Sequence, residues 1–259
     1  MTRAQVILTT GAILLVIGLF QLPRVVVENE LDAEVGESHG FDVSATDEEA
    51  IASLKSLIQA PDSENYVKFA DSLARYYLKY GLIDSAASVS RTTLRRDSSL
   101  SNLKNVASVL YTVFERSPTP EGAELAGAEA RRLLETIVDS EPENLSATTR
   151  LAMTLVVTEN PMLGITLLRD VVARDPAFRE AILNLGLLSM RSGQYDRGVA
   201  RFDELVNRDS TDFEAMFYLG ICYEELGRSP DASELFEKIA ANENADPALQ
   251  VAAREYLSN

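Results

Sequence analysis

Few side chains in this sequence could carry out covalent or metal chemistry. The 259 residues include one histidine, His39, and one cysteine, Cys222. A metal centre usually needs three or four converging ligands, and the sequence has no group of histidines and cysteines that could provide them. Cys222 falls at an interior position of a helical pattern, where a free cysteine acts as a small apolar residue. We therefore predict a protein that is not an enzyme and has no catalytic residue, no metal and no cofactor.

Phosphate binding is not indicated either. Gly193 and Gly227 each end a helical pattern at the same position of successive repeats, so they do not belong to a glycine-rich phosphate loop. The chain has 40 acidic and 24 basic residues, which gives a formal net charge of −16 at pH 7. Such a chain repels the phosphates of nucleic acid. We interpret most carboxylates as parts of solvent-exposed helix faces, and we expect no nucleic-acid partner.

A recurring pair of residues indicates which elements organise the chain. Leucine followed by a small residue occurs at 73–74, 151–152, 185–186 and 219–220. The last three pairs follow one another with a constant period of 34, and the first precedes the second by 78, which is two periods plus ten. Each pair lies on a helical apolar pattern, and a second helical pattern follows it. This period predicts an all-α solenoid, because one helical hairpin cannot bury its apolar face without stacking on another.

The periodicity divides residues 46–259 into five units and two capping helices. The units are expected at 67–100, 101–144, 145–178, 179–212 and 213–246. The second unit is longer than the others, and the segment 117–120, which contains two prolines, separates its two helices. We expect one capping helix at 49–58 and another at 247–258.

Matching positions of the units are expected to bury the contacts between helices. Small residues allow two antiparallel helices to approach closely, and glycine costs about 1 kcal/mol relative to alanine inside a helix. We expect Gly186 and Gly220 to lie opposite Gly198 and Ala232. The predicted packing residues are Leu73, Ala74, Ala86, Leu151, Ala152, Gly164, Leu185, Gly186, Gly198, Phe202, Leu219, Gly220, Tyr223, Ala232 and Phe236.

These positions resemble the tetratricopeptide repeat family over roughly residues 67–246. The large aromatic residue usual at the fourth position is replaced by Met216 and Ile182. The resemblance implies a right-handed solenoid whose concave surface binds a protein or peptide. Residues 159–208 also resemble repeat modules that assist bacterial c-type cytochrome maturation. An accessory role in envelope assembly is therefore one alternative, and a structural module that forms homo-oligomers is another.

In the repeat family, the first helix of each unit lines the concave surface at fixed positions. Transferring these positions predicts a surface that is basic at the first unit, apolar in the middle and acidic at the last unit. An apolar surface can hold an amphipathic helix or an extended peptide, unless a neighbouring or capping helix covers it. The predicted partner-binding residues are Lys68, Arg75, Lys79, Asn105, Thr149, Met153, Val157, Leu183, Leu187, Met190, Phe217 and Ile221.

Residues 1–24 are predicted to form a transmembrane helix that acts as a signal anchor. Residues 4–23 carry no charge, and a helix of this length spans about 30 Å, the thickness of a bilayer core. This run is longer than the apolar region of a cleaved signal peptide, and no A-x-A-like site follows it. We therefore favour an uncleaved single span over a cleaved signal peptide.

Charges on the two sides of this span predict its orientation. Arg3 and the α-amine precede it, whereas Arg24 is followed by the acidic segment 25–45, which we expect to be a flexible tether. The positive-inside rule then places the soluble domain in the periplasm, attached to the cytoplasmic membrane by a single pass. With residues 22–27 leaving the membrane, the chain resembles single-span tetratricopeptide repeat proteins of Bacteroidota-type bacteria.

Overall fold

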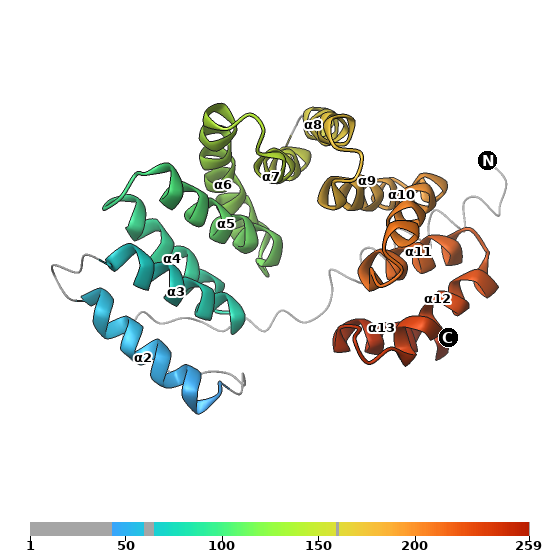
Figure 1. Ribbon diagram of the computed structural model, residues 1–259, viewed down its shortest axis with the longest axis horizontal. Coiled ribbons are helices and arrows are strands. Elements are labelled where there is room, and N and C mark those ends of the chain that lie inside the picture. The colour runs from blue at the N-terminus through green and yellow to red at the C-terminus, as the bar shows by residue number, and fades with distance from the viewer. Residues whose placement is uncertain (1–42, 60–64, 159–160, 259) are drawn as a thin grey trace, which may run out of the picture. The chain divides into compact units, whose positions relative to one another are not determined.

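The computed structural model describes residues 43–59, 65–158 and 161–258 (Figure 1). Within these ranges the chain forms twelve α-helices and no β-strand, which confirms the all-α prediction for this part. The predicted transmembrane helix at 1–24 and nearly all of the tether at 25–45 lie outside the described residues. Of the helices that are described, none has the length and apolar character needed to cross a membrane.

Ten of these helices form five successive pairs. The pairs are α3 (Tyr66–Lys79) and α4 (Ile83–Leu94), α5 (Leu100–Arg116) and α6 (Pro120–Ser140), α7 (Leu145–Val156) and α8 (Pro161–Arg174), α9 (Arg179–Arg191) and α10 (Tyr195–Arg208), and α11 (Phe213–Glu225) and α12 (Ser229–Ala241). We call the odd-numbered members of the pairs, α3 to α11, the first helices and the even-numbered members, α4 to α12, the second helices. Two single helices, α2 (Ala45–Gln59) and α13 (Pro247–Ser258), pack on the outermost pairs.

The helices stack in chain order. Each helix contacts the next one along the chain, and α3 also contacts α5, α7 contacts α9, and α9 contacts α11. In Figure 1 the middle first helices α5, α7 and α9 lie on the inner side of the stack, and α6 and α8 lie on its outer side. This arrangement is the one expected for hairpins that bury their apolar faces against one another.

The second pair is longer than the others because its helices are longer. α5 has 17 residues and α6 has 21, whereas α3 and α4 have 14 and 12. The additional residues predicted in the second unit therefore extend both helices of the pair. The Thr119 side chain caps α6 by accepting a hydrogen bond from the backbone N–H of Gly122, and Pro120 takes the first helical position, where no N–H is needed.

Three pairs share one type of turn. Gly81, Gly193 and Gly227 have φ angles of 70°, 70° and 72°, which side chains with a Cβ rarely adopt. The residue after each glycine donates its backbone N–H to a carbonyl five residues earlier, as from Arg228 to Tyr223 at 2.8 Å. This bond closes the first helix in the manner of a Schellman motif, so the glycine directs the chain into the second helix.

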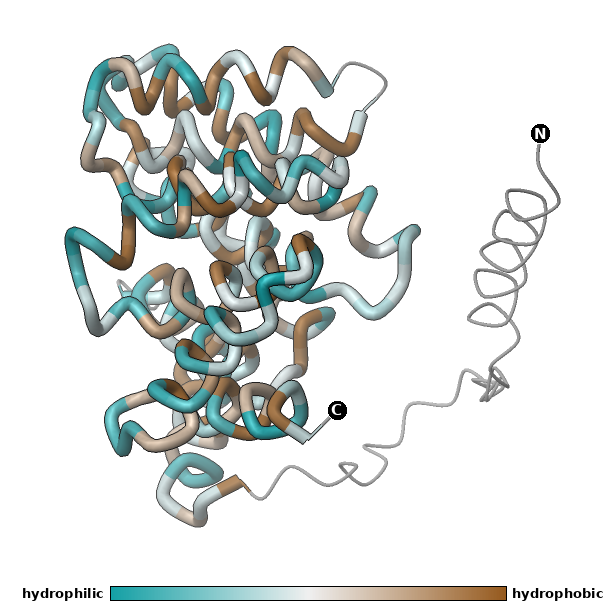
Figure 2. Tube along the Cα trace, turned by 90° about the vertical axis from the view of Figure 1, so that its right-hand side faces the viewer, coloured by the Kyte–Doolittle hydropathy of each residue, from teal (hydrophilic) through white to brown (hydrophobic). Residues whose placement is uncertain are grey.

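The core runs along the stack as a series of apolar contacts between the pairs. Figure 2 shows apolar residues recurring along the helices, with polar residues between them. Large side chains such as Leu73, Phe202 and Phe236 are at most 1% exposed. All the predicted packing residues are buried except Tyr223, which is partly buried and has the Arg228 guanidinium 4.0 Å from its ring centroid.

In two of the units an aromatic ring, and not the small residue that we expected, lies nearest to the glycine of the first helix. A Cβ atom at Gly220 would lie 2.8 Å from the Phe236 ring, and one at Gly186 would lie 2.6 Å from the Phe202 ring. Each glycine of a first helix therefore accommodates an aromatic ring of its second helix. Gly198 instead faces Sγ of Cys222 in the following pair. The gap left by a glycine is filled by the nearest large side chain, which lies one helical turn beyond the small residue that we expected.

The contact between Gly220 and Phe236 leads to a test of the packing. We expect Gly220→Ala to lower the free energy of unfolding by about 1–3 kcal/mol, because the added methyl group overpacks the ring. Gly220→Arg should lower the melting temperature much further. In urea unfolding, Gly220→Ala combined with Phe236→Leu should cost less than the sum of the two single changes. Strictly additive costs would show that the glycine and the ring do not constrain each other.

Candidate functional site

Two of the predicted partner-binding residues, Lys68 and Asn105, line one polar cleft between α3 and α5. This cleft has a volume of about 610 Å³, and its wall also includes Tyr66, Arg96 and Asn102. The Arg96 guanidinium lies 3.7 Å from the centroid of the Tyr66 ring. The Asn102 amide donates to the backbone carbonyl of Asp97 at 2.6 Å. The cleft thus offers ammonium, guanidinium and amide groups that can bind carbonyl or carboxylate oxygens, and the carboxylates of Asp71 and Asp97 line it as well.

The other two basic residues of the first unit have different surroundings. Arg75 and Lys79 line a shallow pocket of about 270 Å³ on α3. Arg75 pairs with Asp71 one turn earlier at 3.0 Å. Lys79 forms an ion pair with Asp47 of α2 at 2.5 Å, and this contact, together with the Tyr80 hydroxyl, holds the pKa of Asp47 below its usual value. Lys79 therefore attaches the capping helix α2, so only part of its charge is available to a partner.

The inner side of the stack carries a set of charged groups around Arg150 of α7. Nη1 of Arg150 donates to Oγ of Ser108 at 3.2 Å, and its guanidinium lies 5.6 Å from the centroid of the Tyr111 ring. Its Nε lies 3.7 Å from a carboxylate oxygen of Glu180 but is buried without a hydrogen-bond partner in the described part of the chain. Arg150 thus connects α5, α7 and α9.

Glu115 of α5 belongs to the same group of charges. The residue is exposed as a whole, yet the pKa of its carboxyl group is raised, first because the surrounding protein removes water from it. Repulsion by Glu180 and Glu214 raises the pKa further, whereas a hydrogen bond from Tyr111 and the charge of Arg150 lower it. Groups on α5, α7, α9 and α11 therefore act on one carboxyl group, which shows that these first helices share one surface.

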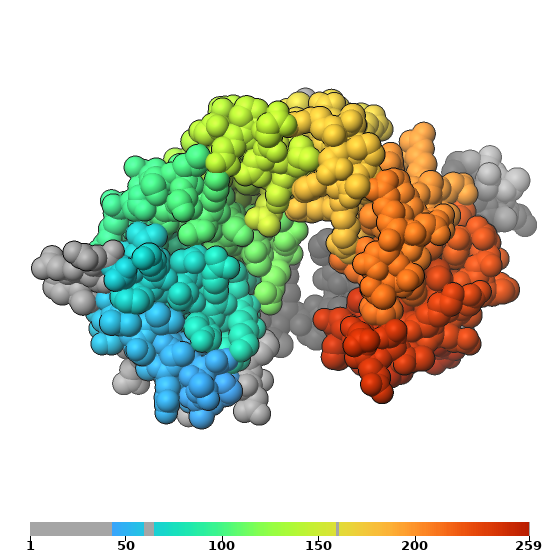
Figure 3. Space-filling view, viewed as in Figure 1, coloured from blue at the N-terminus to red at the C-terminus, as the bar shows by residue number. Residues whose placement is uncertain are grey.

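The predicted apolar contacts are only partly available. Met153, Leu187, Met190 and Ile221 are partly buried against the core, so part of each side chain reaches the surface. Val157 is 53% exposed and lines a cleft of about 560 Å³ with residues of α5 and α6, including Phe114 and Ala123. The space-filling view shows an open hollow between the first pairs and the last pairs (Figure 3).

Two predicted partner-binding residues are covered by the protein itself, and a third, Phe217, is partly covered. Thr149 is fully buried and Leu183 is 8% exposed, so their prediction as contact residues was wrong. Leu183 packs in the cluster that contains Ala215 and Leu219 of the next pair. The Phe217 ring is stacked edge-on against Tyr256 of α13 at 5.7 Å between centroids. At these positions a neighbouring or capping helix occupies the place that we assigned to a partner.

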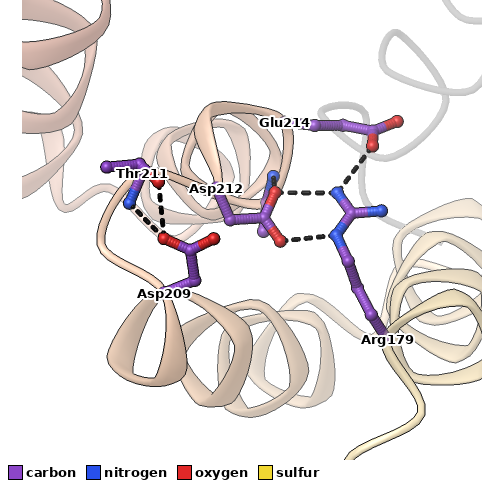
Figure 4. A network of polar contacts seen from close by, with 6 residues as sticks. Arg179, Asp209, Thr211, Asp212 and Glu214 are labelled. Carbon is purple, nitrogen blue, oxygen red and sulfur yellow. Dashed lines mark hydrogen bonds and ion pairs between the residues drawn. The ribbon is translucent and has the colours of Figure 1, made fainter.

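A polar network at the start of α11 was not expected from the sequence (Figure 4). Arg179 of α9 donates two hydrogen bonds of 2.7 Å to the Asp212 carboxylate and one of 2.7 Å to Glu214. Asp212 is buried and also caps α11 by accepting the backbone N–H of Ala215 at 3.0 Å. Asp209 accepts both the backbone N–H and the hydroxyl of Thr211, which lowers the pKa of Asp209. The network fixes α11 relative to α9.

The turns before the first helices contain a signal that could have been found. Asp97, Asp175 and Asp209 each accept the backbone N–H of the residue two positions later, at 2.8, 2.9 and 2.8 Å. These three aspartates recur with the same spacing as the leucines at 73, 151 and 185. A periodic acidic residue that folds back on its own turn has a structural role, so these carboxylates are not simply part of a solvated face.

Cys222 and the acidic residues are the remaining candidates for thiol chemistry or metal binding in the described part of the chain. Cys222 is fully buried, and burial, with a smaller contribution from Glu225, raises the pKa of its thiol to about 12. The thiol therefore stays protonated near neutral pH and is a poor nucleophile. The described residues contain no group of three or more His, Cys, Asp and Glu side chains that could hold a metal ion.

The stacked helical hairpins form a helical-repeat fold. Residues 183–247 match the tetratricopeptide repeat family. A comparison with curated proteins finds no match. The fold is similar to that of a tetratricopeptide repeat protein from Parabacteroides merdae, with a TM-score of 0.60 and 18% sequence identity over 80% of this chain and 77% of that chain.

Two further solved structures have the same fold. A thermophilic tetratricopeptide repeat protein from Thermus thermophilus has a TM-score of 0.58 and 18% identity, over 74% of this chain and 100% of that chain. PilW, described as a widely conserved type IV pilus biogenesis factor, has a TM-score of 0.58 and 16% identity, over 80% of this chain and 90% of that chain. At these identities the similarity extends to the fold alone.

The Asp212 network predicts unequal effects of two substitutions. Asp212→Ala should lower the free energy of unfolding by about 1–3 kcal/mol, because both the helix cap and the partner of Arg179 are lost. Asp212→Asn keeps an oxygen for the cap and should cost less. Glu214→Gln, at an exposed ion pair, should cost almost nothing. Equal losses for Asp212→Ala and Asp212→Asn in urea unfolding would contradict the capping role.

The raised pKa of Glu115 predicts a pH dependence of stability. In the window between 4.5, its ordinary value, and its raised value, the folded chain binds more protons than the unfolded chain. The stabilising contribution of Glu115 to the free energy of unfolding is fully present below this window. The free energy of unfolding then falls as the pH rises through the window. Glu115→Gln should remove this loss, and Tyr111→Phe should widen the window. Urea unfolding across this pH range tests both, and an unchanged slope in Glu115→Gln would contradict the assignment.

Proposed function

We propose that this chain is a non-catalytic scaffold that binds a protein or peptide partner on the inner faces of its first helices. The observation that carries the proposal is the polar cleft between α3 and α5, which the described part of the chain leaves open. Lys68 and Asn105 reach this cleft from two successive first helices, the placement expected of residues that contact a partner. The tetratricopeptide fold supports the proposal, because stacked repeats form extended binding surfaces.

The chemistry of the inner faces indicates the kind of partner. Lys68, Arg96 and Asn105 can bind backbone carbonyls or acidic side chains at α3 and α5. Further along the stack, the exposed parts of Met153, Leu187 and Met190 offer apolar contacts, and methionine adapts well to different partner side chains. A peptide with a polar or acidic end followed by apolar side chains would fit this order. An amphipathic helix or an extended strand could present side chains in this order.

The proposal includes attachment to a membrane. The uncharged run at 4–23, followed by the acidic segment 25–45, supports a single N-terminal span with the repeats in the periplasm. Such an anchor would hold the partner close to the membrane surface, where a tethered binding site acts at a high effective concentration.

Two matched double variants test the inner surface. A photo-crosslinking amino acid at Asn105 of the full chain, in its own membrane, should form an adduct with the partner. Met153→Glu with Leu187→Glu should abolish this adduct, because two charges would be placed at the apolar contact. Met162→Glu with Leu125→Glu, which makes the same changes at exposed positions of α8 and α6, should leave it intact.

Circular dichroism should show that both double variants remain helical. An adduct that persists in Met153→Glu with Leu187→Glu would place the partner elsewhere on the chain. An adduct made only with a second copy of the chain would favour the structural oligomer over the scaffold.

A further inference from the structure

A second cleft lies among α8, α9 and α10 and is lined by basic side chains. Its volume is about 390 Å³, and three guanidinium groups, from Arg169, Arg197 and Arg201, contribute to its wall. Ser189 and Leu185 of α9 also line it, and its one acidic side chain is Glu204. Two of the arginine positions belong to α10 and one to α8, so the cleft is formed mainly by second helices. It is therefore distinct from the surface assigned to the partner above.

The positive charge of this cleft is not neutralised by the described protein. Arg197 donates to the neutral side-chain oxygen of Gln194 at 2.5 Å, and Arg169 forms no ion pair with any described residue. Arg201 lies 4.0 Å from Glu204, which also accepts a hydrogen bond of 2.8 Å from Arg208. One carboxylate is thus shared by two arginines, and the other two guanidinium groups have no acidic partner among the described residues.

This local excess is unusual in a chain of net charge −16. Acids outnumber bases along the sequence, and several other arginines of the described helices, such as Arg150, Arg174 and Arg179, have a carboxylate within reach. Like charges that converge without counter-charges repel one another, so the cluster does not help the fold. An external anion would remove the repulsion.

We propose that this cleft binds an acidic segment of a protein partner, with carboxylate side chains of the segment held by Arg169 and Arg197. A guanidinium group presents parallel N–H donors that match a carboxylate in two-point contact. Leu185 is only 7% exposed, so it and Ala200 contribute a small apolar part of the cleft wall to the methylene groups of a glutamate.

Carboxylates fit this cleft better than phosphate groups do. Phosphate sites usually include free backbone N–H groups, as at helix N-termini. The floor and one wall of this cleft are the sides of α9 and α8, whose N–H groups are used within the helices, and N–H groups in the first turn of α10 donate to the carbonyl of Gln194. Glu204 in the wall also repels a doubly charged phosphate more than a singly charged carboxylate.

The test uses the full chain in nonionic detergent and a fluorescein-labelled decaglutamate peptide. Fluorescence anisotropy at low ionic strength should show saturable binding, and decaglutamine should not bind. Arg169→Glu with Arg197→Glu should weaken binding by at least about tenfold, because contacts to the carboxylates become repulsive. Arg169→Lys with Arg197→Lys should give an intermediate loss, because the charge remains and the two-point contact does not.

Arg95→Glu with Arg132→Glu is the matched control, because it makes the same change in net charge at two exposed arginines elsewhere in the chain. Binding by this control should equal that of the wild type. The Asn105 adduct should form in the Arg169→Glu with Arg197→Glu variant, which separates this cleft from the inner surface.

Three outcomes would overturn the proposal. The first is absence of decaglutamate binding by the wild type. The second is an equal loss in the control, which would mean that the weaker binding follows from the more negative net charge of the variants and not from the cleft. The third is displacement of the peptide by inorganic phosphate at concentrations at which acetate has no effect, which would assign the cleft to phosphate.

Discussion

The close approach of two helices at a small residue underlies the packing of the pairs, most clearly in the fourth and fifth. In the fourth and fifth pairs the ring of Phe202 or Phe236 lies over Gly186 or Gly220, where a Cβ atom would overlap it. The aromatic ring is then fully buried, and the apolar face that one hairpin leaves exposed is buried by the next hairpin. Because one hairpin cannot complete this burial alone, the pairs have to stack in chain order. The surfaces that could bind a partner follow from that stacking.

Polar contacts at the junctions decide how one pair lies on the next. Asp212 caps α11, pairs with Arg179 of α9 and is itself buried. A buried carboxylate needs such partners, since leaving it unpaired would be costly. Lys79 and Asp47 join α2 to α3. Apolar stacking is tolerant of small rotations, whereas these hydrogen bonds have defined directions, so they specify the orientation between neighbouring pairs.

One of the clefts lies where helices of unequal length follow each other. α6 has 21 residues and the following α7 has 12, so the two helices cannot cover each other completely. The cleft with Phe114, Ala123 and Val157 lies at this mismatch. The polar cleft between α3 and α5 and the basic cleft among α8, α9 and α10 lie at other junctions. Binding surfaces of different chemistry are thus placed along one stack, while the single cysteine remains inert in the core.

The repeat, the helices and the identity of most buried residues could be predicted from the sequence alone. The period of 34 located most of the hairpins, and the leucine positions such as Leu73, Leu151 and Leu219 are buried as expected. Pro142 and Pro176 each lie two residues beyond the end of a helix. These features are local, because the helical period and the lack of an N–H in proline act within a few residues of the chain.

Only contacts between distant parts of the chain determine which neighbouring helix packs on each helix face. Thr149 and Leu183 occupy positions that face a partner in related repeats, yet here adjoining helices cover them. Arg169 and Arg197 belong to different hairpins and reach the same cleft. The helical period shows which side of a helix is apolar, but the angle between pairs depends on contacts between hairpins, as between Arg179 and Asp212. No local pattern in the sequence predicts the angle between neighbouring pairs.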